Sequence, residues 1–470
     1  MKHRLARRLH AGRGMSHLSV STRRASRAAL PGTPLFSVLL LLNVVLLFAV
    51  SNLLLGRLGI RYEVAGGALW EKIHPATWLA LLTLALAMFA RPGPVVWLNT
   101  LVARYQPLLI FAFGWLVLFW HAVIDLKLPF TPLIDTFVLP MVLVVLLAAA
   151  RESVLKRAAL LIHVLMGANA ALGLFEAATG WHFTPLIIGD LVQTDDWRAT
   201  ALLGHPLNNA GVTALYLLAL ATGGGRDIPR GALIGLFALN LAAMNVFGGR
   251  VAFVLLLALL AVIGLMRFGR VLAGRPVSLS AAALTLAAAP LLVIAVLGLY
   301  EAGFFERFAQ RFVDDAGSAR ARLIMLELFR HLPARAVLLG PDAERIADLM
   351  RREGLIGLES FWVAFVLTYG LAVSLVFFAG LGALLFHLAR LARPVAWWLV
   401  VFFLLEASTS VSISAKGTGL AALVVIALVL LRKEVGGAQA SRWMNPATRR
   451  AAASRLPRQL SPLFTRGLRS

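Results

Sequence analysis

The sequence predicts an all-α polytopic integral membrane protein, with about 12 transmembrane helices and a helical cap on the outer face. Hydrophobic residues fill 60% of its 470 positions and charged residues 14%, whereas a soluble domain carries about a quarter charged residues. The apolar residues form runs of about twenty, the length that crosses a bilayer as a helix. Basic residues gather between these runs and in the two tails, as they do on the cytoplasmic side of membrane proteins.

Twelve apolar runs are interpreted as spanning helices, and the second, third and twelfth are the marginal ones. In chain order they are Pro34–Leu55, Pro75–Ala90, Gln106–Ala122, Pro132–Ala150, Ala158–Ala178, Leu207–Gly223, Gly231–Phe247, Val251–Met266, Ala281–Tyr300, Phe361–His387, Val395–Ser412 and Gly417–Leu431.

The distribution of positive charge predicts the orientation. The N-terminal tail holds eight Lys/Arg and no acid, and the C-terminal tail holds nine Lys/Arg and one acid. With both tails inside, every short inner loop is basic, and an even number of spans returns the chain to the same side. The net charge of +23 therefore indicates anionic lipid more than nucleic acid. The predicted parts are a basic cytoplasmic tail (1–30), helices 1–9 (31–300), an outer loop (301–359), helices 10–12 (360–431) and a second basic cytoplasmic tail (432–470).

The outer loop is predicted to form three amphipathic helices. "FFERFAQRFVDD" places four Phe on one helical face, which is typical of a helix lying in the membrane interface. "SARARLIMLELFRHL" follows, with Ser318 as its N-cap. "PDAERIADLMRREG" forms the third helix, with Pro341 near its start and Gly354 after its end. Together these helices predict a small cap, either part of a site or an ordered cover without chemistry.

Several classes of function are disfavoured by what the sequence lacks. There is no cysteine, so thiol chemistry, disulfides and cysteine–zinc sites are absent. Neither GxxxxGK[ST] nor GxGxxG occurs, so the chain is not expected to hydrolyse ATP itself. The acid pairs Asp195-Asp196 and Asp314-Asp315 lack the spacing of a metal–nucleotide-sugar site, and no metal is predicted. No repeat relates the two halves, which disfavours a repeat-built transporter.

Four arginines at the predicted outer surface are candidates for binding a diphosphate. Arg198 lies in "DDWRATALLGHPLNNAG", Arg250 follows the tight turn made by two glycines in "FGGRVA", and Arg320 and Arg322 open the second loop helix. A guanidinium is a permanently charged fork that binds phosphate oxygens in pairs and stabilises charge on a departing phosphate. The competing interpretations are a pair between Arg198 and a neighbouring Asp, and ordinary surface charge for the loop arginines.

Three further polar residues complete the candidate site. His205 precedes a proline and a predicted span, with Asn208 close behind it, so these residues either cap the helix or take part in chemistry. Glu359 precedes the tenth predicted span, where the helix dipole favours a carboxylate. Placed beside the outer arginines, Glu359 or His205 is a candidate general base for a sugar hydroxyl.

The order of these segments resembles that of the O-antigen ligase and Wzy-type polysaccharide polymerase superfamily. "RATALLGHPLNNAG" is similar to that family's Arg followed by Gly-x-Pro-Asn, and "FGGRVAF" to its Ser-Arg hairpin. "SARARLIMLELFRHLPARAVLLGPD" resembles its Arg-containing loop helix, and "GLESFWVAFVLTYGLAVSLVF" the entry to its next span. The resemblance covers roughly residues 195–378. Leu207 interrupts the Gly-x-Pro-Asn pattern, and Glu359 stands where the family often has His or Asp.

The resemblance implies an inner-membrane glycosyltransferase that uses neither metal nor other cofactor. Its donor is a glycan on undecaprenyl diphosphate, transferred with inversion on the periplasmic face. By this likeness, Arg198 and Arg250 hold the diphosphate and Arg322 assists. The absence of the ligase histidine favours a polymerase of O-antigen or exopolysaccharide repeats over a ligase acting on lipid A-core. Membrane lipids are further partners, nucleic acid is not, and the need for a chain-length-regulating copolymerase stays open.

A 12-helix transporter is the alternative from another class. It requires charged residues within the spans, and the chain offers few, chiefly Asp135 and Glu406. It also predicts movement of a substrate without bond formation.

Overall fold

The structure is a computed structural model that describes residues 33–64, 66–90, 93–188, 191–193, 196–274, 297–298, 300–301, 303–306, 309–310, 318–355, 357–410 and 412–433. The chain divides into two units, residues 1–431 and 432–470, and every element named below lies in the first. Both predicted tails, most of the predicted ninth span and the Phe-rich loop helix fall largely outside the described residues.

Six helical segments within the described residues are long and apolar enough to cross a membrane. They are Gln106–Asp125 (α6, Gln106–Trp120, with η2, His121–Asp125), Thr131–Ala148 (α7, Thr131–Leu133; η3, Ile134–Val138; α8, Leu139–Ala148), α9 (Glu152–Thr179), α11 (Arg230–Phe247), α12 (Arg250–Leu272) and α19 (Leu371–Leu391). α4 (Pro75–Phe89) and α5 (Pro94–Arg104) give a seventh only if this bent pair is one span.

Shorter apolar helices account for most of the other predicted runs. They are α2 (Pro34–Ala49), η6 (Pro394–Ala396) with α20 (Trp397–Ala407), and α21 (Gly419–Val425) with η8 (Ile426–Leu430). The run that begins at Leu207 is covered by α10 (Pro206–Ala219) with η4 (Leu220–Gly224), which belongs to neither group. Large side chains on outward faces stay exposed, such as Phe113 at 62% and Leu265 at 70%, as lipid-facing residues do. The protein is therefore an all-α membrane protein, with six or seven long apolar helices among its described residues.

The remaining elements are short. They are α3 (Asn52–Arg57), η1 (Leu69–Lys72), β1 (Ile187–Ile188), β2 (Leu191–Val192), α15 (Ser318–Glu327), η5 (Leu328–His331), α16 (Ala334–Leu339), α17 (Ala343–Arg352), α18 (Phe361–Tyr369) and η7 (Ser412–Ser414). The two strands pair antiparallel, with Ile187 opposite Val192. The second and third predicted loop helices are thus present as α15 with η5 and as α17, whereas α16 between them was not predicted. Gly354 follows α17 with a φ of 67°.

The helix boundaries follow from proline and glycine. Pro75 and Pro206 occupy the first helical position, where the missing N–H costs nothing. Gly248 ends α11 with a φ of 66°, a left-handed conformation that favours glycine, and α12 begins at Arg250. This confirms the tight turn predicted from "FGGRVA".

The predicted span Phe361–His387 is broken in the structure. Gly370 has a φ of 78° and a ψ of 156°, so α18 ends before it and α19 begins after it. The nitrogen of Gly340, at the end of α16, lies so close that a Cβ at Gly370 would overlap it. The single-helix prediction was wrong because composition alone does not distinguish Gly370, where the helix breaks, from Gly380 and Gly382, which lie inside α19.

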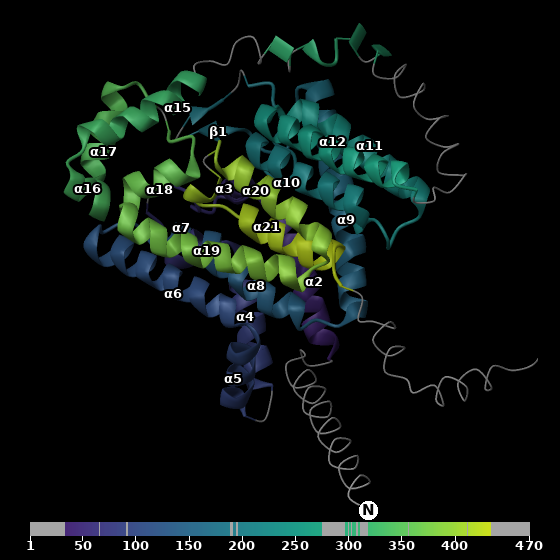
Figure 1. The fold of residues 1–470 in the computed structure, drawn as a ribbon, viewed down its shortest axis with the longest axis horizontal. Coiled ribbons are helices and arrows are strands. Elements are labelled where there is room, and N and C mark those ends of the chain that lie inside the picture. Colours follow the sequence, from purple (N-terminus) through teal and green to yellow (C-terminus); the bar gives the residue numbers. More distant parts are fainter. Residues whose placement is uncertain are drawn as a thin grey trace, which may run out of the picture. The chain divides into compact units, whose positions relative to one another are not determined.

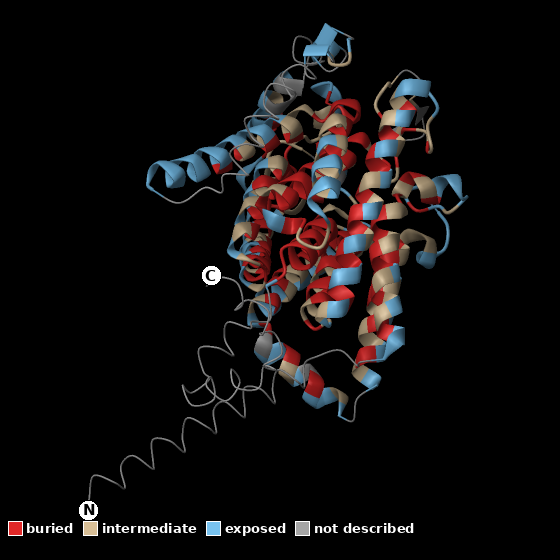
Figure 2. Ribbon diagram, turned by 90° about the vertical axis from the view of Figure 1, so that its right-hand side faces the viewer, coloured by how far each residue is buried: buried red, intermediate tan, exposed pale blue. Residues whose placement is uncertain are grey.

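Helices α6 and α19 run side by side along most of their length (Figure 1). A Cβ at Gly114 would lie 3.0 Å from the Val376 carbonyl oxygen, and one at Gly380 would lie 3.1 Å from the Ile110 carbonyl oxygen. Two glycines facing the opposite backbone let the helices approach as small residues do in membranes. Figure 2 shows buried positions gathered on the facing sides of the helices and exposed positions on their outward sides.

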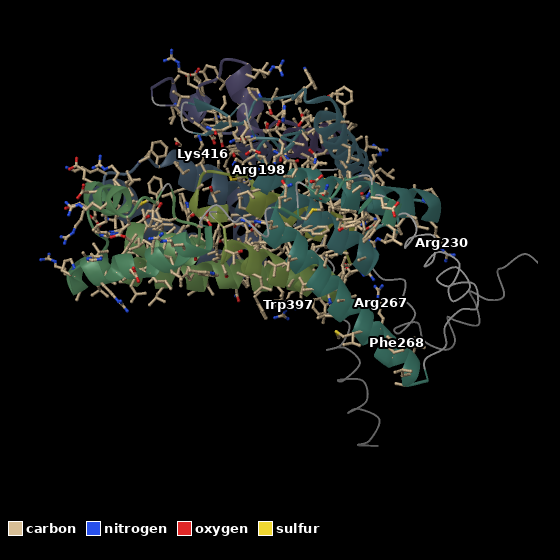
Figure 3. The ribbon with its side chains drawn as sticks, turned by 90° about the horizontal axis from the view of Figure 1, so that it is seen from above. Arg198, Arg230, Arg267, Phe268, Trp397 and Lys416 are labelled. Atoms are coloured by element: carbon tan, nitrogen blue, oxygen red, sulfur yellow. The ribbon has the colours of Figure 1, made fainter. Side chains whose placement is uncertain are left out.

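Contacts at the ends of helices and in the loops beside them distinguish two ends of the helical body. At the first, called the basic end, Arg267 donates to the Ala221 carbonyl at 2.7 Å and Arg393 to the Gly223 carbonyl at 3.2 Å. At the other, called the cavity end, Lys416 donates to the Tyr62 carbonyl at 2.8 Å. Figure 3 shows Lys416 toward one side of the view and Arg267 toward the other.

Candidate functional site

A cavity of about 380 Å³ opens at the cavity end of the helices. Its walls come from the ends of α2 and α20, the start of α10, and the loops that precede α4 and α21. Its volume falls in the range of small-molecule sites, about 300–1,000 Å³. The polar and charged residues that line it include Glu63, His74, His205, Asn208, Glu406 and Lys416.

Two side chains of α9 hold the segment that leads into this cavity. The buried Glu176 carboxylate accepts backbone N–H groups of Phe183 and Thr200 at 2.8 Å and of Ala201 at 3.0 Å. The Asn169 side-chain oxygen accepts the next N–H, from Leu202, at 3.0 Å. Consecutive backbone donors that have no helix or strand partner are therefore satisfied from one neighbouring helix.

His205 ends this segment and caps α10. Its ring Nδ1 accepts the Leu207 N–H at 3.3 Å, which satisfies a first-turn donor. Burial, then the nearby charge of Arg198, lower the pKa of His205 to about 4. At neutral pH the ring is therefore neutral with Nδ1 as acceptor, and Nε2 carries the proton. Of the two interpretations of Asn208, a helix cap is not seen; its amide donates back to the Leu203 carbonyl at 3.2 Å.

Lys416 reaches the cavity from the loop between α20 and α21. Its ammonium lies 3.4 Å from the centroid of the Tyr62 ring and donates to the Tyr62 carbonyl. Burial lowers the pKa of Lys416 to about 8, against the opposing pull of Asp135 and Glu63. The ammonium has two further donors, and a lysine so placed combines a charge with hydrogen-bonding capacity inside the cavity.

The fully buried Asp135 fixes the loop beneath Lys416. Its carboxylate accepts the Tyr62 hydroxyl at 2.8 Å, the Thr77 hydroxyl at 2.6 Å and the His74 backbone N–H at 3.0 Å. The His74 ring accepts the Ala76 N–H through Nδ1 and donates from Nε2 to a carbonyl oxygen at 2.8 Å. Burial lowers the pKa of His74, consistent with this neutral arrangement.

Glu406 contributes a half-buried carboxylate to the opposite wall. Oε1 accepts the Ser410 hydroxyl at 2.9 Å. A Cβ at Gly211 of α10 would lie 3.8 Å from Oε1, so the absence of a side chain there leaves room beside the carboxylate. The cavity thus places a carboxylate from α20 near residues that follow His205 in α10.

Arg198 forms an ion pair with Asp196. Its Nε lies 2.8 and 2.9 Å from the two carboxylate oxygens, Nη2 also donates to the carboxylate, and only 13% of the side chain is exposed. The structure therefore shows the alternative interpretation of Arg198, which is an ion pair with a neighbouring aspartate. The Nη1 of Arg198 has no partner among the described residues, so this nitrogen of the guanidinium can still donate to a ligand.

Arg250 lies beside the same segment. The Ala199 N–H donates to the Val246 carbonyl at 3.0 Å, which joins the segment containing Arg198 to the end of α11. Gly249 packs so closely on α10 that a Cβ would overlap Ala210. The half-buried Arg250 side chain makes no hydrogen bond or ion pair with another described residue.

The outer-loop candidates lie apart from the cavity lining. Arg320 is exposed on α15, and the Arg322 side chain lies outside the described residues. The Glu359 N–H lies 3.0 Å from the Met325 sulfur of α15, and Glu359 is not a lining residue. The structure therefore brings His205 and Asn208 together in the cavity, with Arg198 close to His205, and does not bring Glu359 there.

Sequence reasoning missed Lys416, Tyr62 and Glu63, and it named Glu406 only as a feature of a transporter. One signal for Lys416 was available. It is a lone cation among small residues in "SISAKGTG", between two apolar runs, and few such positions occur in the chain.

Comparison with known proteins assigns no family. No protein-family model matches the chain, and no curated protein is significantly similar to it.

Proposed function

We propose that the chain is a membrane-embedded glycosyltransferase that joins undecaprenyl-diphosphate-linked oligosaccharide repeats into exopolysaccharide or O-antigen. The observation that carries the proposal is the convergence of segments far apart in the sequence. The segment containing Arg198, the turn before Arg250 and the cavity containing His205 all meet at one end of the helices. Two arginines beside a polar cavity suit a reaction whose leaving group is a diphosphate.

The proposal includes a twelve-span topology in the bacterial inner membrane, with both termini cytoplasmic and residues 301–359 as a periplasmic cap. Contacts between segments that are predicted to lie on the same side of the membrane support this topology. Loops predicted to be cytoplasmic meet at the basic end, through Arg267 and Arg393. Loops predicted to be periplasmic meet at the cavity end, where His121 contacts the Leu339 carbonyl at 3.0 Å.

Within this proposal Arg198 and Arg250 bind the diphosphate, with Arg320 and Arg322 as the cap's contribution. His205 acts as a hydrogen-bond donor and not as a base, because its Nδ1 is committed to capping α10 and its pKa of about 4 makes it a weak proton acceptor. Asn208 offers an amide beside it. The donor glycan, membrane lipids and a chain-length-regulating copolymerase remain the proposed partners.

The transporter alternative is favoured by two carboxylates within predicted spans, Asp135 and the half-buried Glu406. Glu406 accepts the Ser410 hydroxyl. Asp135 is fully buried, but its oxygens already accept hydrogen bonds from Tyr62, Thr77 and His74. A carboxylate held by three neutral donors stabilises the loop and needs no cation. The glycosyltransferase is the better-supported proposal.

Reconstitution of the full chain in lipid vesicles with lipid-linked repeats tests the function. Wild-type protein is expected to form polymer, and Arg250→Ala to reduce its rate by about 10²–10³, as loss of one charge-stabilising donor does. Arg335→Ala, which changes an exposed arginine of α16, is the matched control. Transfer only to lipid A-core would identify a ligase. Movement of the lipid-linked substrate without a new glycosidic bond, or unchanged polymer yield in Arg250→Ala, would contradict the mechanism.

A further inference from the structure

The charge of the cavity does not suit a diphosphate. Its lining contains the carboxylates of Glu63 and Glu406 against the single ammonium of Lys416, and the buried Asp135 adds a third carboxylate behind Tyr62. His205 is neutral at physiological pH. A ligand with two or more negative charges would meet net repulsion here, whereas Arg198 and Arg250 lie outside this lining.

The same lining suits the hydroxyl groups of a sugar. Carboxylates accept hydroxyl protons, and amides, ammonium groups and neutral histidines donate to hydroxyl oxygens. Glu406, Asn208 and Lys416 provide these types from three different elements. Phe402 and Phe403 add apolar surface on the α20 side, against which the C–H face of a sugar ring can pack.

Resting on the function proposed above, we propose that the cavity binds the acceptor sugar and that Glu406 takes the proton from its attacking hydroxyl. The hydroxyl oxygen forms the new bond to the anomeric carbon of the donor. The bond from that carbon to the diphosphate oxygen breaks, and the diphosphate leaves with the electron pair. The hydroxyl proton passes to the Glu406 carboxylate and then to solvent.

The geometry favours Glu406 over Glu359 for this role. Glu406 lines the cavity, and the side-chain-free Gly211 leaves space beside its Oε1. The Ser410 hydroxyl fixes the orientation of the carboxylate from within the next turn. Glu359 precedes α18, beside Met325 of α15 and outside the lining.

The test uses the full chain in nanodiscs with lipid-linked repeats. Glu406→Gln is nearly isosteric and keeps an oxygen that can accept the Ser410 hydroxyl, so it removes the base with little change in shape. It is expected to lower kcat for polymerisation by about 10²–10³, a larger effect than any change in the KM for the lipid-linked repeats. Glu344→Gln, at an exposed position of α17, is the matched control, and Glu359→Gln tests the competing carboxylate.

A second measurement requires no turnover. The oligosaccharide released from the lipid-linked repeats by mild acid is added to the purified protein, and saturation-transfer NMR detects its binding. Binding to wild type that weakens in Glu406→Gln and Asn208→Ala supports the cavity as the sugar site, even if the wild type proves not to be a polymerase. The inference is overturned if the wild type polymerises the repeats and Glu406→Gln does so at the same rate, or if only Glu359→Gln loses the polymerisation rate. Either result leaves the proposed function in place.

Discussion

The ammonium of Lys416 lies 3.4 Å from the centre of the Tyr62 ring and donates to the carbonyl of the same residue. The Tyr62 hydroxyl in turn donates to Asp135 at 2.8 Å, so one tyrosine links a cavity cation to a buried carboxylate. Cation–π contact stabilises an ammonium that is partly removed from water. Burial nevertheless lowers the pKa of Lys416 to about 8, and the residue is therefore partly neutral at mildly alkaline pH.

We expect one lysine of the folded protein to titrate near pH 8. The chain has six lysines, so NMR of isotopically dimethylated protein can resolve the signal and assign it as the one absent from Lys416→Arg. The unfolded chain holds the Lys416 proton up to about pH 10.5, so stability should rise between pH 8 and 10.5, and Lys416→Met should lack this increment. A Lys416 signal that titrates with the other five would contradict the burial argument.

The acid side of the stability profile should depend on His205. Its pKa is about 4 in the folded protein and 6.5 when unperturbed, so the unfolded chain takes up a proton that the folded chain refuses. Stability is therefore expected to fall as pH falls from 6.5 toward 4. His205→Asn keeps a capping side chain and removes this titration, so its thermal midpoint should vary less over that range. His331→Asn, at an exposed histidine, should keep the wild-type profile.

The boundaries that depend on local backbone chemistry were predictable. Proline at the first helical position and glycine at the end of α11 act through their own φ preferences, so Pro206 and Gly248 were interpretable without a fold. The break at Gly370 was not, because the backbone of Gly340 that packs against it is distant in sequence. The short lengths of α2, α20 and α21 also depend on packing, which hydropathy does not report.

The candidate site was predictable only in part, for a similar reason. His205 and Asn208 were found because polar residues stand out at the start of an apolar run. Lys416 and Glu406 reach the same cavity from the opposite end of the chain, and only the meeting of α10, α20 and α21 places them there. Arg198 stayed open between a ligand-binding residue and a partner of a neighbouring Asp, and the ion pair with Asp196 needed coordinates.

Glu176 is expected to be essential for the shape of the segment before His205. Its carboxylate accepts the N–H groups of Phe183, Thr200 and Ala201, and Glu176→Ala would leave these donors unpaired. Each buried unpaired donor costs about 1–3 kcal/mol, so a loss of about 3–5 kcal/mol is expected, with Glu176→Gln intermediate. Thermal unfolding in detergent measures the loss. Hydrogen exchange should show increased opening of residues 181–188 and 196–205, whereas Glu344→Ala should change neither.

The close crossing of α6 and α19 gives a prediction with an internal control on one helix. A Cβ at Gly380 would lie 3.1 Å from both the Ile110 carbonyl oxygen and the Phe111 Cα, whereas a Cβ at Gly382 would meet nothing within 4 Å. Because the obstructing atoms at Gly380 are backbone, α6 and α19 must separate to admit a methyl group. Overpacking of this kind costs about 1–3 kcal/mol. Gly380→Ala should therefore lower the thermal midpoint.

Gly382→Ala should raise the midpoint or leave it unchanged, since alanine favours a helix over glycine by about 1 kcal/mol. The two variants differ by two positions in the same helix and by the same methyl group, so propensity, hydrophobicity and expression affect them alike. The opposite ordering, with Gly382→Ala the less stable, would mean that α6 and α19 do not cross at Gly114 and Gly380. A Gly114→Ala variant, whose Cβ would lie 3.0 Å from the Val376 carbonyl oxygen, should reproduce the loss from the other side of the contact.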